Sequence, residues 1–185
     1  SSAAAISQAA PIWQDFSFTG LYGENYAHPV NMDDNNQQTT ATVEYTAKLK
    51  YGDFFGFADR AHNDFENSTY FELSPRLSLS AVTGTKLEAG PIKDILIAGT
   101  WEANSSNYPG ADFNNYLYGI GFDLAIPYFQ YAQLNFYKAD NEKGTTDDYQ
   151  MTAAYGIPVK LGSEGFLVDG FLDWSRGENA THASE

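Results

Sequence analysis

Hydrophobic and polar residues alternate at every second position over long stretches of this chain. Across residues 41–51 the odd positions are apolar or aromatic, and the even positions are Thr, Glu or Lys. Residues 70–80 repeat the pattern, with Phe71 and Leu77 on one face and Glu72 on the other. A period of two is typical of a β-strand with one apolar and one polar face. The pattern therefore predicts long strands, one after another.

The same alternation predicts nine strands along the chain. Their predicted ranges are 13–23, 40–51, 52–61, 69–81, 92–103, 114–126, 129–139, 148–158 and 165–176. A strand of about ten residues is long enough to cross a bilayer at a tilt. The pattern indicates an all-β protein, an antiparallel transmembrane β-barrel. The alternative is a soluble antiparallel sandwich with its aromatic residues in the core.

The links between these strands alternate in character. Long links rich in Asn, Asp, Gly and Ser are predicted at 24–39, 61–68, 104–113 and 140–147, and short ones at 51–52, 127–128 and 159–164. Long loops on one side and short turns on the other are typical of outer-membrane barrels. The link 81–91 departs from this rule because it is longer than a turn.

Composition and charge exclude several classes of protein. The formal net charge is −14, from 24 acidic and 10 basic residues, so a basic nucleic-acid-binding surface is not expected. Cysteine is absent, which excludes disulfides and thiolate metal sites. No run approaches the roughly 18 apolar residues of a spanning helix. The mean hydropathy of −0.40 fits a barrel, because half of each strand faces a wet lumen.

Two predicted strands place aromatic and charged side chains on the same inward face. In the third strand these are Asp53, Phe55, Phe57 and Asp59, and in the ninth Asp169, Phe171 and Asp173. Aromatic rings provide stacking surface, while carboxylates accept hydrogen bonds from hydroxyl or amino groups. This combination favours a planar, partly polar solute such as a nucleoside. The alternative is that the Phe side chains only fill a narrow lumen.

Glu72 and Arg76 share the polar face of the fourth predicted strand. They are candidates for binding solute hydroxyls. The alternative is that they pair with neighbouring charges and brace the lumen, because charged side chains that line barrels are often held in networks.

Five segments of the chain are distinctive: YGDFFGFAD at 51–59, FELSPRLS at 71–78, GPIKD at 90–94, YGIGFDL at 118–124 and VDGFLDW at 168–174. In this order they resemble segments of the nucleoside-specific channel-forming outer-membrane proteins, the Tsx family, which includes the OmpK-like proteins. The resemblance implies a monomeric barrel of twelve strands in the bacterial outer membrane, surrounded by lipid. It also implies passive uptake of nucleosides and, in some members, recognition by phage or colicin proteins.

Nine strands are an odd number, whereas single-chain bacterial barrels close with an even one. We therefore expect about three further strands after Glu185, an estimate that follows from the resemblance. The alternative is that the chain ends where order ends. The expected organisation is a disordered segment at 1–12, barrel strands at 13–177 and a loop or truncated tail at 178–185.

Other functions have weaker support in the sequence. His28, His62 and His182 lack metal-ligand spacing, so no metal or other cofactor is expected. Nucleophile and phosphate-loop motifs are absent, and the pair Asp169 and Asp173 is a weak basis for a glycoside hydrolase, so no enzymatic activity is expected. The main alternative to transport is a receptor or structural envelope protein that uses its long loops for recognition.

Overall fold

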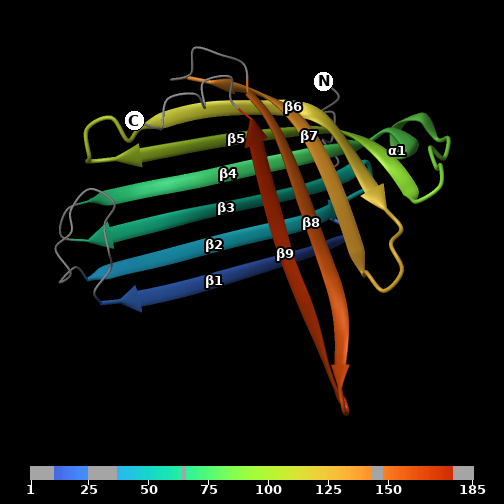
Figure 1. Cartoon of the computed structure of the whole chain (residues 1–185), viewed down its shortest axis with the longest axis horizontal. Coiled ribbons are helices and arrows are strands. Elements are labelled where there is room, and N and C mark those ends of the chain that lie inside the picture. Colours follow the sequence, from blue (N-terminus) through green and yellow to red (C-terminus); the bar gives the residue numbers. More distant parts are fainter. Residues whose placement is uncertain (1–10, 25–36, 64–65, 143–147, 177–185) are drawn as a thin grey trace, which may run out of the picture.

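A single antiparallel sheet forms most of the described part of the protein. The computed structural model describes residues 11–24, 37–63, 66–142 and 148–176. Its sheet has nine strands, and each pairs with its neighbours in chain order (Figure 1). The strands are β1 (Trp13–Gly23), β2 (Gln38–Leu49), β3 (Gly52–Asn63), β4 (Asn67–Ser78), β5 (Ile92–Ser106), β6 (Phe113–Leu124), β7 (Tyr131–Asn141), β8 (Asp148–Leu161) and β9 (Glu164–Arg176).

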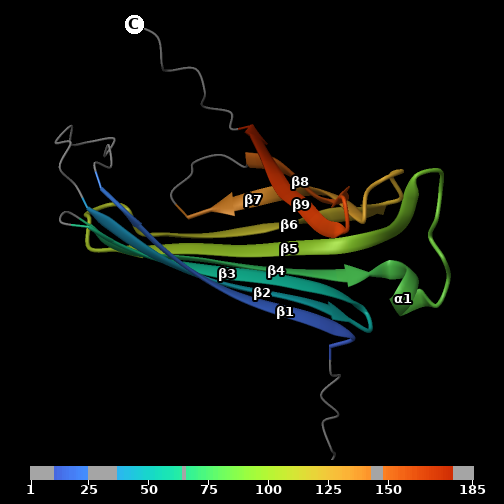
Figure 2. The same ribbon diagram turned by 90° about the horizontal axis from the view of Figure 1, so that it is seen from below.

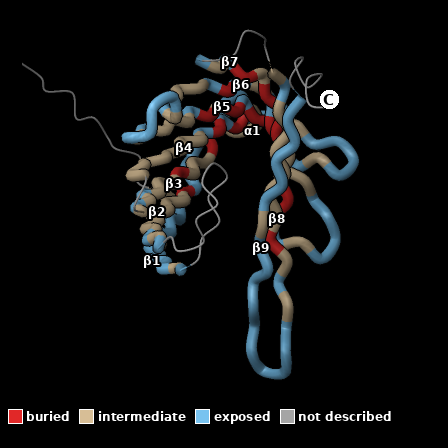
Figure 3. The backbone as a smooth tube through the Cα atoms, turned by 60° about the vertical axis from the view of Figure 1, so that its left-hand side comes forward, coloured by how far each residue is buried: buried red, intermediate tan, exposed pale blue. Residues whose placement is uncertain are grey.

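The sheet curls into a half-barrel. Figure 3 shows β1 to β4 on one side of an arch, β5 to β7 over its top, and β8 and β9 descending on the other side. Figure 2 shows the same curvature from another direction, with β9 lying across the strands beneath it. The strands therefore enclose a trough, which we call the lumen.

All nine predicted strands are present, and the antiparallel transmembrane architecture is confirmed. The sandwich alternative is wrong, because the strands form one continuous sheet instead of two packed ones. Among the described residues, no helix has the length and apolar run that membrane crossing requires.

The pairing register separates two faces with different chemistry. On the outer face Phe16, Phe18, Ile97, Ile120 and Phe136 are all exposed. The inner face carries polar side chains that hydrogen-bond one another across strands. An exposed apolar face with a polar interior is the arrangement expected of a barrel in lipid.

The end of β4 differs from the sequence prediction. The strand predicted at 69–81 ends at Ser78, and α1 (Leu79–Thr83) begins there. The Ser78 hydroxyl accepts a hydrogen bond from the Ala81 amide at 3.0 Å, which caps the helix. Serine at this position satisfies a free amide of the first turn. The unusually long link at 81–91 is thus explained by a helix and the segment that follows it.

The predicted long link at 61–68 is wrong. β3 continues to Asn63 and β4 begins at Asn67, so only three residues connect them. The Asn63 amide donates to the Glu66 carbonyl at 2.9 Å, and the Asn63 side chain accepts from the Glu66 amide at 2.7 Å. Polar residues that resembled a loop therefore extend the strands, and Asn63 and Glu66 hydrogen-bond to each other beside the strand ends.

A small apolar cluster lies on the inner face at the top of the arch. Ala98, Leu117, Tyr137 and Ala139 from β5, β6 and β7 are all buried. Most of the buried positions visible in Figure 3 lie in this region. This part of the wall is therefore packed, while the inner faces of β1 and β9 are open.

The predicted chain ends fall largely outside the described residues. Of the segment 1–12, Pro11 and Ile12 are described, and the Ile12 amide donates to the Lys48 carbonyl at 2.8 Å. The predicted tail at 178–185 lies outside the described residues, so both assignments stay predictions.

Replacing Ile120 with Arg should destabilise the protein in a bilayer by about 2–4 kcal/mol, because Ile120 lies on the outer face within β6. Urea unfolding from lipid vesicles measures this change. As a control, Leu161→Arg, also on the outer face but at the last residue of β8, should cost less. Equal small costs at both positions would contradict the assignment of this face to lipid.

Candidate functional site

All nine predicted binding residues project from the inner face of the sheet. Their register partners there include other polar side chains, as Asp53 opposite Arg76, Phe57 opposite Glu72 and Thr152 opposite Asp173 illustrate. The strands bring these residues together in three groups: an aromatic track, a buried cluster around Arg76, and the open inner face of β9.

The aromatic track runs across β3, β4 and β6. Phe55 and Phe57 have ring centroids 5.9 Å apart, Phe57 and Tyr70 5.4 Å, and Tyr70 and Phe113 6.1 Å. These distances are typical of interacting aromatic pairs. Phe113 begins β6, so the track extends from mid-strand to the end of the lumen where residues 107–112 connect β5 to β6.

A row of glutamates lies beside the track. Glu44, Phe57, Glu72 and Glu102 are successive register partners on β2 to β5. The carboxylates of the three glutamates accept hydrogen bonds from neutral groups: Ser17 Oγ donates to Glu44 at 2.9 Å and Ser74 Oγ to Glu72 at 2.7 Å. This row, which we call the glutamate row, places acceptors along the edge of an aromatic surface.

Two further donors complete the glutamate row. Asn115 Nδ2 donates to Glu102 at 2.9 Å. The Tyr70 hydroxyl lies 3.4 Å from Glu72 and 3.3 Å from Glu102, so it is placed to donate to either carboxylate. Tyr70 therefore belongs both to the aromatic track and to the hydrogen-bond network of the row.

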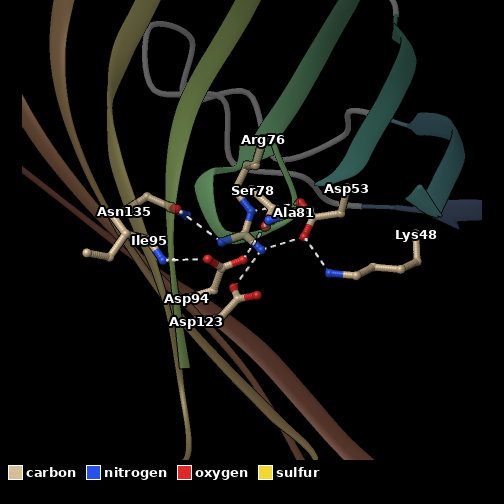
Figure 4. A network of polar contacts seen from close by, with 9 residues as sticks. All are labelled: Lys48, Asp53, Arg76, Ser78, Ala81, Asp94, Ile95, Asp123 and Asn135. Carbon is tan, nitrogen blue, oxygen red and sulfur yellow. Dashed lines mark hydrogen bonds and ion pairs between the residues drawn. The ribbon is translucent and has the colours of Figure 1, made fainter. Parts of the chain in front are cut away.

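Arg76 is the centre of a buried polar cluster (Figure 4). Its Nε and Nη2 atoms donate to the two carboxylate oxygens of Asp53 at 2.8 and 2.6 Å. Nη2 also contacts Asp123 at 2.8 Å, and Nη1 contacts Asn135 at 3.3 Å. Arg76 is only 6% exposed. The planar guanidinium forms a bidentate pair with one carboxylate and still reaches others, which lysine cannot do.

This Arg76 cluster joins strands that are not adjacent in the sheet. Asp53 lies on β3, Asp123 on β6 and Asn135 on β7, so the Arg76 side chain must pass over β5. The residue opposite Arg76 on β5 is Ala98, which is small. A Cβ atom on Gly121 would lie 2.5 Å from Asn135 Oδ1. Small residues at these positions leave space for the cluster.

The predicted residues on β9 lie on an open surface. Phe171 is 76% exposed and has no aromatic partner within the described ranges. Thr152 Oγ1 donates to Asp173 at 2.6 Å. The curl of the sheet places β9 across the trough from β1 to β4 (Figure 3).

Asp59 differs from the other acids of the lumen. Its Oδ1 atom is buried and has no hydrogen-bond partner among the described residues. Its register partners are Thr42 and Tyr70. One acceptor beside the aromatic track is therefore unused by the described part of the chain.

Several residues of the site were not singled out from the sequence. They are Glu44, Tyr70, Glu102, Phe113, Asp123 and Asn135. Alternation alone puts each on an inner face, but it does not say which residues of different strands lie in the same row. Within the described ranges, no group of three or more metal-ligating side chains occurs.

Comparison with known proteins agrees with this geometry. The family model for the nucleoside-specific channel-forming protein Tsx matches residues 12–185. The chain belongs to the Tsx family. Tsx-family proteins form channels in the bacterial outer membrane, and the family is not an enzyme family. The protein is therefore assigned to that membrane.

Curated relatives are distant. The chain is similar to the outer membrane protein OmpK of Vibrio parahaemolyticus, with 22% identity over 93% of this chain and 66% of the relative. It is also similar to the nucleoside-specific channel-forming protein Tsx of Klebsiella pneumoniae, with 24% identity over 87% of this chain and 60% of the relative. The chain therefore spans about two thirds or less of these relatives' lengths.

Replacing Arg76 with Met should lower the free energy of unfolding by about 3 kcal/mol, because Asp53 and Asp123 would lose their buried cation. This is the lower end of the usual range, since both carboxylates keep some contact with water. Chemical denaturation in detergent micelles or vesicles measures it.

Lys48→Met is the matched control. Lys48 lies 3.7 Å from Asp53, and its side chain is half exposed, so its loss should cost less than about 1 kcal/mol. Equal effects of the two substitutions would contradict the structural role of the Arg76 cluster.

Proposed function

We propose that the protein is a selective channel for passive uptake of nucleosides across the outer membrane. The observation that carries this proposal is the aromatic track from Phe113 to Phe55, with the glutamate row along its edge. The name of the Klebsiella relative, a nucleoside-specific channel-forming protein, supports the same solute.

The chemistry of a nucleoside matches both parts of this surface. Its base is planar and stacks on aromatic rings, an interaction worth about 1–3 kcal/mol per base. Its sugar hydroxyls are donors, and carboxylates such as Glu72, Glu102 and Asp59 are acceptors. Each contact is weak enough to be exchanged for the next, as conduction requires.

Asp53 and Arg76 have a different role in this proposal. Arg76 pairs with both Asp53 and Asp123, so Asp53 and Arg76 brace the wall instead of binding solute. Asp169, Phe171 and Asp173 are on the opposite side of the lumen, where Phe171 offers a second stacking surface. We further propose that the protein acts as a monomer surrounded by outer-membrane lipid.

The receptor hypothesis stays a prediction. It depends on the long links, and residues 25–36 and 143–147 within them lie outside the described residues. In the described link at 107–112, the Tyr108 side chain is exposed. Exposed tyrosine is common in protein-binding loops but also in loops without a partner, so no observation favours phage or colicin binding over transport.

Phe57→Ala should slow nucleoside entry and lower the affinity of the lumen by about fivefold or more, because one stacking surface is lost. Swelling of proteoliposomes in nucleosides, compared with sugars of similar size, measures this change. Phe54→Ala is the matched control. Phe54 lies on β3 three positions before Phe57, but on the outer face, where its ring lies 6.1 Å from Tyr45.

Equal swelling rates for the two variants would show that stacking on the inner face does not select nucleosides. A protein that swells vesicles in sugars and nucleosides alike would be a general pore. A protein that causes no swelling would favour the receptor or structural alternative.

A further inference from the structure

The inner face of the lumen is acidic, and its cations are already engaged. On the described strands, the cationic side chains that the register places inward are Lys48, Arg76 and Lys160. Arg76 binds Asp53 and Asp123, and Lys48 lies 3.7 Å from Asp53. Lys160 lies beside the turn between β8 and β9. The middle of the lumen therefore receives little positive charge from the protein.

Carboxylates in the middle of the lumen have neutral partners instead. Glu72 and Glu102 are directly opposite each other on β4 and β5, and they accept hydrogen bonds from Ser74, Asn115 and Tyr70. Like charges directly opposite in a sheet are destabilising. Hydrogen bonds from hydroxyl and amide groups stabilise the charged carboxylates without cancelling their charge.

More acids extend this negative region around the lumen. Glu44 continues the glutamate row on β2, and Asp173 lies on the inner face of β9, opposite Thr152. Asp59 has one oxygen without a partner in the described part of the chain. The negative charge thus comes from both sides of the trough, where solute and small ions pass close to it.

We propose that the lumen is cation-selective: it passes small cations, and solutes that carry positive charge, in preference to anions. Rings of Asp and Glu select cations in channels because they raise the local concentration of positive charge and repel negative charge. This inference rests on the proposed channel function but adds a charge preference that aromatic stacking does not supply.

The test is the reversal potential of the native protein, purified from outer membranes and reconstituted in planar bilayers under a tenfold KCl gradient. The expected result is a potential of the sign set by K⁺, with K⁺ several-fold more permeant than Cl⁻. The preference for K⁺ should shrink when the salt is raised from about 0.1 M to about 1 M, because the screening length then falls from about 10 Å to about 3 Å.

Glu102→Gln should move the reversal potential toward zero, because it removes one charge of the glutamate row and retains an amide that hydrogen-bonds. Asp140→Asn is the matched control, since it removes one charge from the outer face of β7, opposite Tyr116. It should leave the ion preference unchanged.

A reversal potential near zero or of the opposite sign would overturn the inference while leaving nucleoside transport standing. Equal shifts in the two variants would also overturn it, because the preference would then not arise in the lumen. Absence of any conductance would contradict the channel itself and the inference with it.

Discussion

A backbone that crosses hydrocarbon must satisfy its own N–H and C=O groups, because the surrounding lipid offers no partners. This chain does so over β2 to β8 with a continuous antiparallel ladder in which each strand pairs with both of its neighbours in sequence, while β1 and β9 each pair along one edge within the described residues. The ladder also fixes which side chains share a face, since direct partners point the same way. The apolar outer surface, the aromatic track and the glutamate row all follow from that register.

The lumen combines a rigid wall with an open surface. At the top of the arch, the Arg76 cluster and the apolar cluster around Leu117 and Tyr137 hold β3 to β7 together from inside. Beside them, the track and the glutamate row present groups whose partners are neutral or missing. In the proposed channel, stability and solute contact thus belong to different residues of the same face. This division explains why Glu72 and Arg76, the two charged residues on the inner face of β4, differ in their contacts.

Much of the fold could be predicted because a period of two is a local property of the sequence. All nine strands and the inward direction of Asp53, Phe55, Phe57 and Asp59 follow from it. Strand ends were less predictable, since the N-cap at Ser78 and the pairing of Asn63 with Glu66 depend on hydrogen bonds between residues three positions apart. The Arg76 cluster was harder still, because it joins β3, β4, β6 and β7 and depends on register and on small residues at Ala98 and Gly121.

The central claim is that the inner face binds nucleosides as they pass. The most direct test is the single-channel current of the native protein in a planar bilayer as adenosine or thymidine is added. Binding predicts a current that falls in a saturable way with nucleoside concentration, while ribose alone has little effect. A current that does not change with nucleoside, or that falls equally with ribose, would contradict the account.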